Sequence, residues 1–279
     1  MRDYYDQQRW VNAVRQGVAE LAKFAGATPS ASIVLIGHFK DATSQYLKGF
    51  PGWALDALPL QGNIDASALR DAYFGNADSA GGALDATLAA LISQVPASTL
   101  AFLRAWAALP YFQTLAQEWK SLHQEKARWA SAPYPPVFVT VDAIVQCSGR
   151  VLLIERGRAP GKGLLAVPGG FIEQRETVYQ SALRELAEET NIRLLEGDMQ
   201  HALKAVQVFE HPDRSQRGRV ITHAHLFDLG MRRLPEVQAA DDATHARWVP
   251  IEELAGLEDR FHDDHFHMLD LFFSLTPRS

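Results

Sequence analysis

Cysteine is nearly absent from this sequence, because its 279 residues include only one, Cys147. A single cysteine excludes an intramolecular disulfide and favours a reducing compartment. It stands in the strand-like run VFVTVDAIVQC, where a packed small hydrophobic residue is a better interpretation than a nucleophile. Long apolar runs are missing too, and the opening MRDYYDQQRW has no hydrophobic signal core. These absences predict a cytoplasmic protein with no membrane partner.

Positive charge is also scarce. The chain has 27 Lys and Arg residues against 33 Asp and Glu residues, so its formal net charge is −6. This balance argues against a general affinity for nucleic acid, and an anionic ligand would have to be bound by a local cluster of cations. A chain of 279 residues is long for one compact core and predicts two domains.

Proline marks the predicted boundary between these domains. The segment SAPYPP at 131–136 has three prolines in six residues, which stops any helix and indicates a linker between domains at 1–130 and 137–279. The sequence on each side of the linker predicts an α/β domain. Before the linker we expect helices at 10–24, 67–74, 83–94 and 99–129 (interrupted at Leu109-Pro110) and a strand at 32–37. After it we expect a hairpin at 137–146 and 150–156, strand-like runs at 203–210, 219–229 and 246–254, and a closing helix at 263–275.

Glutamate is abundant in GGFIEQRETVYQSALRELAEETNI, residues 169–192. On a helix that starts near Thr177, Glu185, Glu188 and Glu189 stand at i, i+3 and i+4 and share one face beside an apolar stripe. Like charges at these spacings repel, and a hard divalent cation such as Mg²⁺ would offset the repulsion. Arg184 can hold one of the glutamates through a charge-assisted hydrogen bond. For three glutamates alone, an acidic solvated helix face is the alternative.

The full spacing resembles the Nudix box, Gly-x5-Glu-x7-Arg-Glu-U-x-Glu-Glu-x-Gly-U with U aliphatic, from Gly170 to Ile192. The one departure is Asn191, where the family has glycine. Asparagine tolerates positive φ better than other non-glycine residues, so we still expect a left-handed helix end. The resemblance covers about residues 137–279 and implies an α/β/α sandwich.

The resemblance to Nudix hydrolases also implies the chemistry of the site. Water would attack a nucleoside diphosphate linked to a second group, with Mg²⁺ or Mn²⁺ as the cofactor. Glu189 and Asp242 are both candidates for the base that takes the proton. The implied metal site comprises Glu185, Glu188, Glu189, Glu176 and Gly169, and the implied catalytic residues are Glu189, Glu188, Asp242 and Arg184.

Two basic clusters stand out in this acidic chain. RGRAPGKG supplies Arg156, Arg158 and Lys162, and HPDRSQRGR supplies Arg214, Arg217 and Arg219, which suit substrate phosphates; ordinary exposed turns are the alternative. Taken with DDATHARWVP and DDHFHMLDLFF, these stretches look like the Nudix half of bifunctional nicotinamide mononucleotide (NMN) adenylyltransferase/Nudix hydrolases. That half is similar to ADP-ribose pyrophosphatases, although Leu165 stands where the family often has tryptophan. The histidines of HDDHFH fit packing better than a metal site.

The N-terminal segments IGHFKDATSQYLKGFPGW (36–53) and IDASALR (64–70) resemble stretches of the adenylyltransferase half. The resemblance implies ligand-binding roles for His38, Lys40, Asp41, Trp53, Ser67 and Arg70. A core tryptophan and a plain helix cap are the alternatives for Trp53 and Ser67. No counterpart of the family's ATP-binding Gly-x-Phe-x-Pro-x-His-x-Gly-His loop precedes Tyr4. We therefore expect an incomplete Rossmann-like domain, with an internal or misassigned start at Met1 as one hypothesis.

Together these features predict a Mg²⁺-dependent Nudix pyrophosphatase that acts on ADP-ribose or a related nucleotide sugar, linked to NAD metabolism. A homodimer is compatible with them. The alternatives are an NMN adenylyltransferase, if the N-terminal domain is complete in the native protein, a non-catalytic Nudix-like ligand sensor, and a hydrolase of damaged nucleoside triphosphates.

Overall fold

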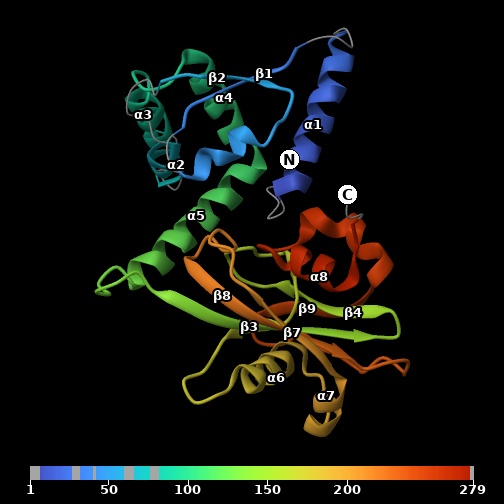
Figure 1. Ribbon diagram of the computed structural model, residues 1–279. Coiled ribbons are helices and arrows are strands. Elements are labelled where there is room, and N and C mark those ends of the chain that lie inside the picture. Colours follow the sequence, from blue (N-terminus) through green and yellow to red (C-terminus); the bar gives the residue numbers. More distant parts are fainter. Residues whose placement is uncertain (1–6, 27–31, 40–41, 60–65, 76–81, 277–279) are drawn as a thin grey trace. The chain divides into compact units, whose positions relative to one another are not determined.

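The computed structural model describes residues 7–26, 32–39, 42–59, 66–75 and 82–276 (Figure 1). The chain forms two compact units, one within residues 1–70 and one within residues 71–278. This division concerns spatial contacts, and the domains at 1–130 and 137–279 with their linker at 131–136 stay a prediction. Among the described helices, none is both long enough and apolar enough to cross a membrane.

The first unit contains a small parallel sheet. It consists of α1 (Gln7–Phe24), β1 (Val34–Gly37), the 3-10 helix η1 (Ala42–Lys48) and β2 (Ala54–Ala57). The two strands pair in parallel, with Val34 opposite Ala54. Val11, Leu47 and Phe50 are buried there. Helix α2 (Ala66–Gly75) runs from this unit into the second.

A helical cluster opens the second unit, with α3 (Gly82–Ala90), α4 (Ala97–Ala107) and α5 (Pro110–Arg128). The predicted interruption of the long helical segment is confirmed, because α5 begins with Pro110 at its first position. Proline lacks the N–H that an interior helix position must donate, so it ends one helix and suits the first turn of the next. Tyr73, Leu88 and Phe112 form the buried centre of the cluster.

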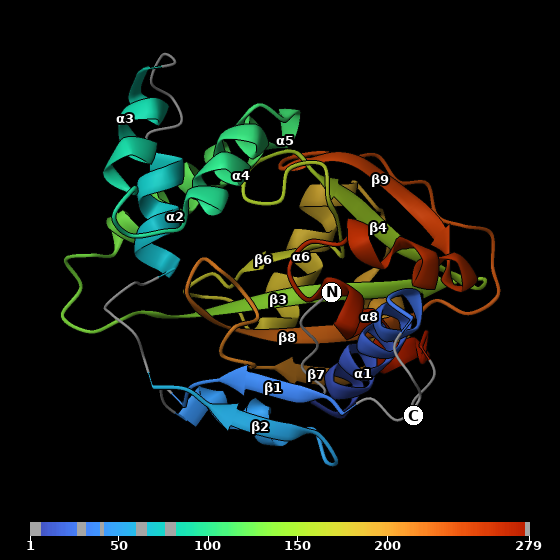
Figure 2. The same ribbon diagram turned by 90° about the horizontal axis from the view of Figure 1, so that it is seen from above.

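The rest of the second unit is a seven-stranded mixed sheet between two helical layers (Figures 1 and 2). Its strands are β3 (Val137–Cys147), β4 (Arg150–Arg156), β5 (Leu165–Ala166), β6 (Gly169–Phe171), β7 (Leu203–Phe209), β8 (Arg219–Asp228) and β9 (Ala243–Pro250). The strand order is β5-β4-β3-β8-β7, with β6 on β3 and β9 on β4. The predicted hairpin is confirmed, since β3 and β4 pair antiparallel through Cys147 and Arg150.

Alternation along the strands builds a core on each face of this sheet. Ala143, Val145 and Cys147 pack with α6 (Val178–Thr190) and α7 (Glu196–Ala202), whereas Ile144 faces the other way. The opposite core includes residues of the 3-10 helix η2 (Ile251–Arg260) and α8 (His265–Phe273). Helices therefore cover both faces, and Cys147 is fully buried as a small hydrophobic residue.

Candidate functional site

The ends of α6 are fixed by local hydrogen bonds. At its start Thr177 and Gln180 form a capping box, with the Gln180 N–H donating to Thr177 Oγ1 (3.3 Å) and the Thr177 N–H donating to Gln180 Oε1 (2.9 Å). At its end Asn191 adopts a left-handed conformation with φ 50° and ψ 19°, as predicted. The helix therefore begins and ends where the sequence indicates.

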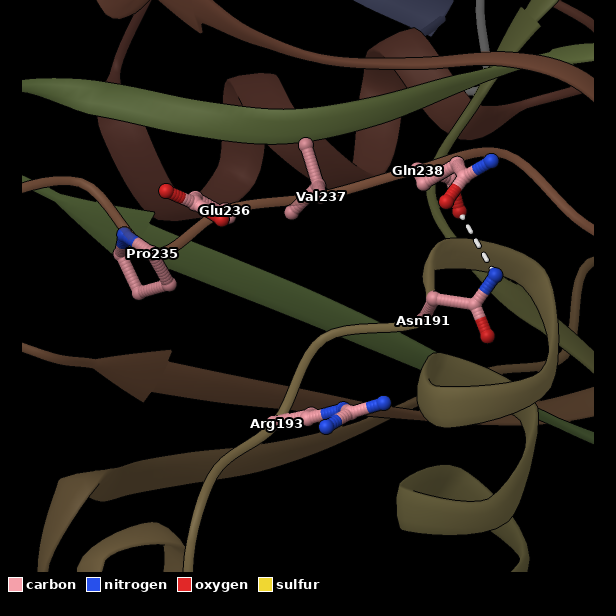
Figure 3. A pocket seen from close by; sticks show the side chains of 6 residues that line it. All are labelled: Asn191, Arg193, Pro235, Glu236, Val237 and Gln238. Atoms are coloured by element: carbon pink, nitrogen blue, oxygen red, sulfur yellow. Dashed lines mark hydrogen bonds between the residues drawn. The ribbon is translucent and has the colours of Figure 1, made fainter.

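A segment before Asp242 lies along the C-terminal end of α6 (Figure 3). The N–H of Gln238 donates to the Thr190 carbonyl at 2.8 Å, and the N–H of Ala240 donates to the Glu189 carbonyl at 3.1 Å. Asn191 Nδ2 donates back to the Gln238 carbonyl at 3.3 Å. These bonds use helix carbonyls that would otherwise lack partners. The adjoining open pocket of about 670 Å³, lined by Asn191, Arg193, Pro235, Glu236, Val237 and Gln238, contains none of the predicted site residues.

Arg184 contacts three glutamates, where the sequence predicts one. Its Nε lies 2.9 Å from Glu176 Oε2, and its Nη1 lies 2.8 Å from Glu185 Oε1 and 2.9 Å from Glu188 Oε2. Burial alone would lower the pKa of Arg184, but the hydrogen bonds to these carboxylates raise it above its usual value. Hydrogen bonds from Ser181 and then Arg184 lower the pKa of Glu176. Arg184 thus positions the acids of the box.

Glu185 and Glu189 lie against the backbone of β6. Glu189 is 5% exposed, and its Oε2 accepts a hydrogen bond from the Gly169 N–H at 2.9 Å. A Cβ atom at Gly170 would stand 2.5 Å from Glu185 Oε1, so a side chain at this position would displace the carboxylate. Burial raises the pKa of Glu189 to about 8, and the nearby Glu185 adds to the rise. Burial also raises the pKa of Glu185.

This donor set fits a hard divalent cation. The partly buried Glu185 disfavours the ionised form of the buried Glu189, and a cation that takes oxygen ligands relieves this repulsion. Within the described ranges, however, no three Asp, Glu, His or Cys side chains form a metal-binding group. Arg184 contacts Glu176, Glu185 and Glu188, and of these three only Glu185 lies with Glu189 against the backbone of β6. Glu185 and Glu189, beside Gly169, are therefore the residues that fit the metal best.

A narrow inner cleft brings three of the predicted substrate-binding arginines together. Arg156, Arg214 and Arg217 line it with Gly169 and Gly170. Burial, and then the charge of Arg217, lower the pKa of Arg156. Gathered guanidinium groups beside a predicted metal site provide the electrostatics for a diphosphate.

Arg214 is also held within the protein. Its Nε and Nη2 donate to the two carboxylate oxygens of Asp264 at 3.0 and 2.8 Å, and the two residues are 5% and 1% exposed. A buried bidentate pair of this kind orients a side chain. The predicted substrate role of Arg214 stays a prediction.

The other predicted cations lie elsewhere. Arg158 Nη1 is 2.7 Å from Asp242 Oδ1; the Arg158 side chain is largely exposed and that of Asp242 is half exposed. Arg219 donates to the Glu210 carbonyl. Lys162 lines a second, wider cleft. None of these three lines the inner cleft.

Sequence reasoning missed several buried polar residues of the site. Asp142 lines the inner cleft and accepts a hydrogen bond from Thr222 Oγ1, and burial raises its pKa to about 6. His265 Nδ1 accepts a hydrogen bond from the Val167 N–H at 3.1 Å. His262 is 5% exposed. The available signals were a lone aspartate inside an apolar strand and the cluster HDDHFH, in which His262 is buried and His265 and His267 are partly buried.

The N-terminal candidates can be placed only in part, because Lys40 and Asp41 lie outside the described residues. His38 is exposed. The Trp53 ring stacks on Phe50 with centroids 4.9 Å apart, and the Arg15 guanidinium lies 5.3 Å from its centre. Arg70 Nη2 donates to Ser67 Oγ at 3.3 Å near the start of α2. Their ligand-binding roles stay predictions.

The family model of the NUDIX domain matches residues 136–272. Over 98% of this chain and 77% of that one, the protein is 32% identical to a bifunctional NMN adenylyltransferase/ADP ribose pyrophosphatase from Francisella tularensis, with a TM-score of 0.80. The chain therefore belongs to the Nudix family. More particularly, it is similar to these bifunctional enzymes, and its N-terminal region is nucleotidyltransferase-like. The predicted resemblance and the α/β fold class with a C-terminal Nudix sandwich are confirmed.

Curated relatives match over shorter stretches. The ADP-ribose pyrophosphatase of Methanocaldococcus jannaschii is 37% identical over 120 residues, which are 43% of this chain and 65% of that protein. The nicotinamide/nicotinic acid mononucleotide adenylyltransferase of Acinetobacter baylyi is 30% identical over 120 residues, 43% of this chain and 55% of that protein. The chain thus spans less than two thirds of either relative.

Proposed function

We propose that this Nudix protein hydrolyses ADP-ribose to AMP and ribose 5-phosphate and so acts in NAD metabolism. The observation that carries the proposal is the pair Glu185 and Glu189 against the backbone of β6, next to a cleft lined by arginines. A site for a divalent cation therefore adjoins a site for a diphosphate. The M. jannaschii relative, named an ADP-ribose pyrophosphatase, supports this substrate.

The proposed cofactor is Mg²⁺, with Mn²⁺ as the alternative. Glu185 and Glu189 would hold it beside Gly169, and Arg184 would position Glu188 and Glu176 around them. Once bound, the cation would neutralise the diphosphate and lower the pKa of a bound water. A structure of the Francisella enzyme described as complexed with AMP and a Mn ion supports both the metal and the product.

The protein's own residues would bind the substrate and move one proton. Arg156 and Arg217 would hold the diphosphate, while Asp264 keeps Arg214 in the cleft wall. Water adds to one phosphorus, the bond from that phosphorus to the bridging oxygen breaks, and a carboxylate takes the proton. Asp242, which is half exposed and held by Arg158, and the buried Glu189 are the two candidates.

A substrate panel tests this function. The chain is incubated with Mg²⁺ and, separately, ADP-ribose, NADH, diadenosine polyphosphates and oxidised dGTP, and the products are separated by chromatography. We expect AMP from ADP-ribose, with activity abolished in Glu189→Gln. Asp242→Asn distinguishes the two candidates for the proton acceptor. If Asp242 takes the proton, its loss lowers kcat and leaves the metal affinity unchanged, because Asp242 lies outside the proposed metal site.

The alternatives give different results in the same panel. Turnover of oxidised dGTP alone would point to a nucleotide-sanitising hydrolase. Binding of ADP-ribose without turnover of any member would contradict the proposal and favour a ligand sensor. NAD formation from ATP and nicotinamide mononucleotide tests the adenylyltransferase alternative.

A further inference from the structure

Helix α5 presents two different faces. Phe112 and Ala116 are buried on one stripe, and Phe112 belongs to the core of the helical cluster. A second stripe repeats at Leu115, Glu118 and Leu122, rotated from the first by about a third of a turn at about 100° per residue. These three residues are only partly covered or exposed. The second stripe therefore serves something other than the core of the cluster.

This second stripe is attached to the loops of the Nudix domain. Glu118 Oε2 accepts a hydrogen bond of 2.7 Å from the Gly161 N–H, in the loop that carries Lys162. Glu125 Oε1 lies 3.8 Å from Arg217 Nη1. The helix is thus fixed to both basic segments, although it precedes the residues 136–272 that the family model matches.

A cleft of about 480 Å³ lies between these attachments. Leu115 and Leu122 of α5 and Pro160 and Leu164 of the loop supply its apolar walls. Its volume is in the range of small-molecule sites. It adjoins the inner cleft, because Ser215, Arg217 and Asp263 line both.

Two nitrogen atoms in the cleft walls lack hydrogen-bond partners. Within the described part of the chain, neither His262 Nε2 nor Arg217 Nε has one, although both atoms are buried. His262 Nε2 lies 3.4 Å from Asp263 Oδ2 without forming a hydrogen bond. Burial and the neighbouring arginines lower the pKa of His262 to about 2, so its ring is neutral. Buried polar groups in native proteins are nearly always satisfied, which points to a ligand with a polar edge.

We propose that this cleft binds the heterocyclic base of the nucleoside diphosphate, with α5 as one wall. Apolar side chains on two sides suit the faces of a planar ring, and the nitrogens of Arg217 and His262 suit its edge. In the substrate a single ribose joins the base to the diphosphate, so the sites for these two groups must lie side by side. The two clefts meet this requirement because they share lining residues. This assignment rests on the proposed hydrolysis of ADP-ribose and adds specificity-determining residues, Leu115 and Leu122, from outside the matched domain.

The two products distinguish the two ends of the substrate. AMP carries the base and ribose 5-phosphate does not, so we compare their inhibition of ADP-ribose hydrolysis in Leu115→Ala/Leu122→Ala. We expect KM for ADP-ribose and Ki for AMP to rise ~10-fold, as for the loss of apolar contacts in a binding pocket. The kcat and the Ki for ribose 5-phosphate should change less than about twofold, since an apolar wall contributes the same binding to ground and transition states.

Leu271→Ala on α8 is the matched control, because Leu271 is 45% exposed and Leu115 is 44% exposed. It should change none of these constants. Leu115→Met, which keeps an apolar wall, should retain most of the affinity that the unmodified chain has for AMP. A rise in the Ki of ribose 5-phosphate instead of AMP, or no change in either, would overturn the proposal.

Calorimetric titration with AMP separates this proposal from the proposed function. If the chain hydrolyses no ADP-ribose but binds AMP, and the double variant binds it more weakly, the base site stands and the hydrolase assignment fails. If the chain turns over ADP-ribose and the double variant binds AMP normally, the base site fails alone. Absence of AMP binding by the unmodified chain would also refute the base site.

Discussion

Arg184→Lys is the sharpest test of how the acidic helix is organised. Lysine keeps the positive charge but loses the planar fork that reaches Glu176, Glu185 and Glu188 together. The Arg184 side chain is 23% exposed, so the lost bonds are partly screened and we expect a net cost of about 2 kcal/mol. At roughly 2–4 °C per kcal/mol for a domain of this size, the midpoint of thermal unfolding should fall by about 4–8 °C.

The same change should weaken metal binding. Residues that orient metal ligands contribute about 10–100-fold to affinity, so the Kd for Mn²⁺ should rise by that factor. Isothermal titration calorimetry measures the Kd, and circular dichroism measures unfolding of the metal-free protein. Arg193→Lys is the matched control, because Arg193 is exposed just beyond the end of α6 and should show neither effect. Equal metal affinity and equal thermal stability in Arg184→Lys and the unmodified chain would refute the reasoning.

Two further changes test local features of the fold. Thr177→Ala removes the capping box and should lower the free energy of unfolding by about 1 kcal/mol in urea titrations, whereas Thr177→Ser should retain most of it; equal losses in both variants would exclude the cap as the cause. Asp264→Ala leaves the buried Arg214 without its bidentate partner and should cost about 3–5 kcal/mol. Asp259 is exposed, so Asp259→Ala is the control in the same urea titration. If Asp264→Ala lowers the free energy of unfolding by less than about 1 kcal/mol, the stabilising role of the Arg214–Asp264 pair is contradicted.

Features coded by neighbouring residues could be predicted from the sequence. The helix start near Thr177, the left-handed Asn191 and the helix interruption at Leu109-Pro110 each depend on a few adjacent residues, and all three occur as expected. Arg184 was predicted to reach one glutamate because spacing along a helix identifies its neighbours on the same face. Its bond to Glu176 requires the loop before the helix to fold back, which periodicity does not describe.

Contacts between residues far apart in the sequence explain most of the site features that the sequence did not predict. The parallel pairing of β3 with β8 joins residues about 80 apart in the sequence, and it brings Thr222 to Asp142, which lines the inner cleft. The two-sided α5 is another example. Its sequence predicts a helix, but the partner of its second stripe depends on where the loop at Gly161 lies.

Gly169 and Gly170 illustrate how little space surrounds β6, toward β3 at Gly169 and toward the acidic helix at Gly170. Neither has a positive φ, so the backbone would accept other residues at both positions. A methyl group at Gly169 would stand 2.3 Å from the Val141 carbonyl oxygen, and one at Gly170 would strike Glu185. Gly169 therefore sets how closely β6 approaches the neighbouring strand β3, and Gly170 sets how closely it approaches the Glu185 side chain of α6. A side chain at Gly169 would disturb the pairing of the two strands, whereas one at Gly170 would displace a carboxylate of the acidic helix.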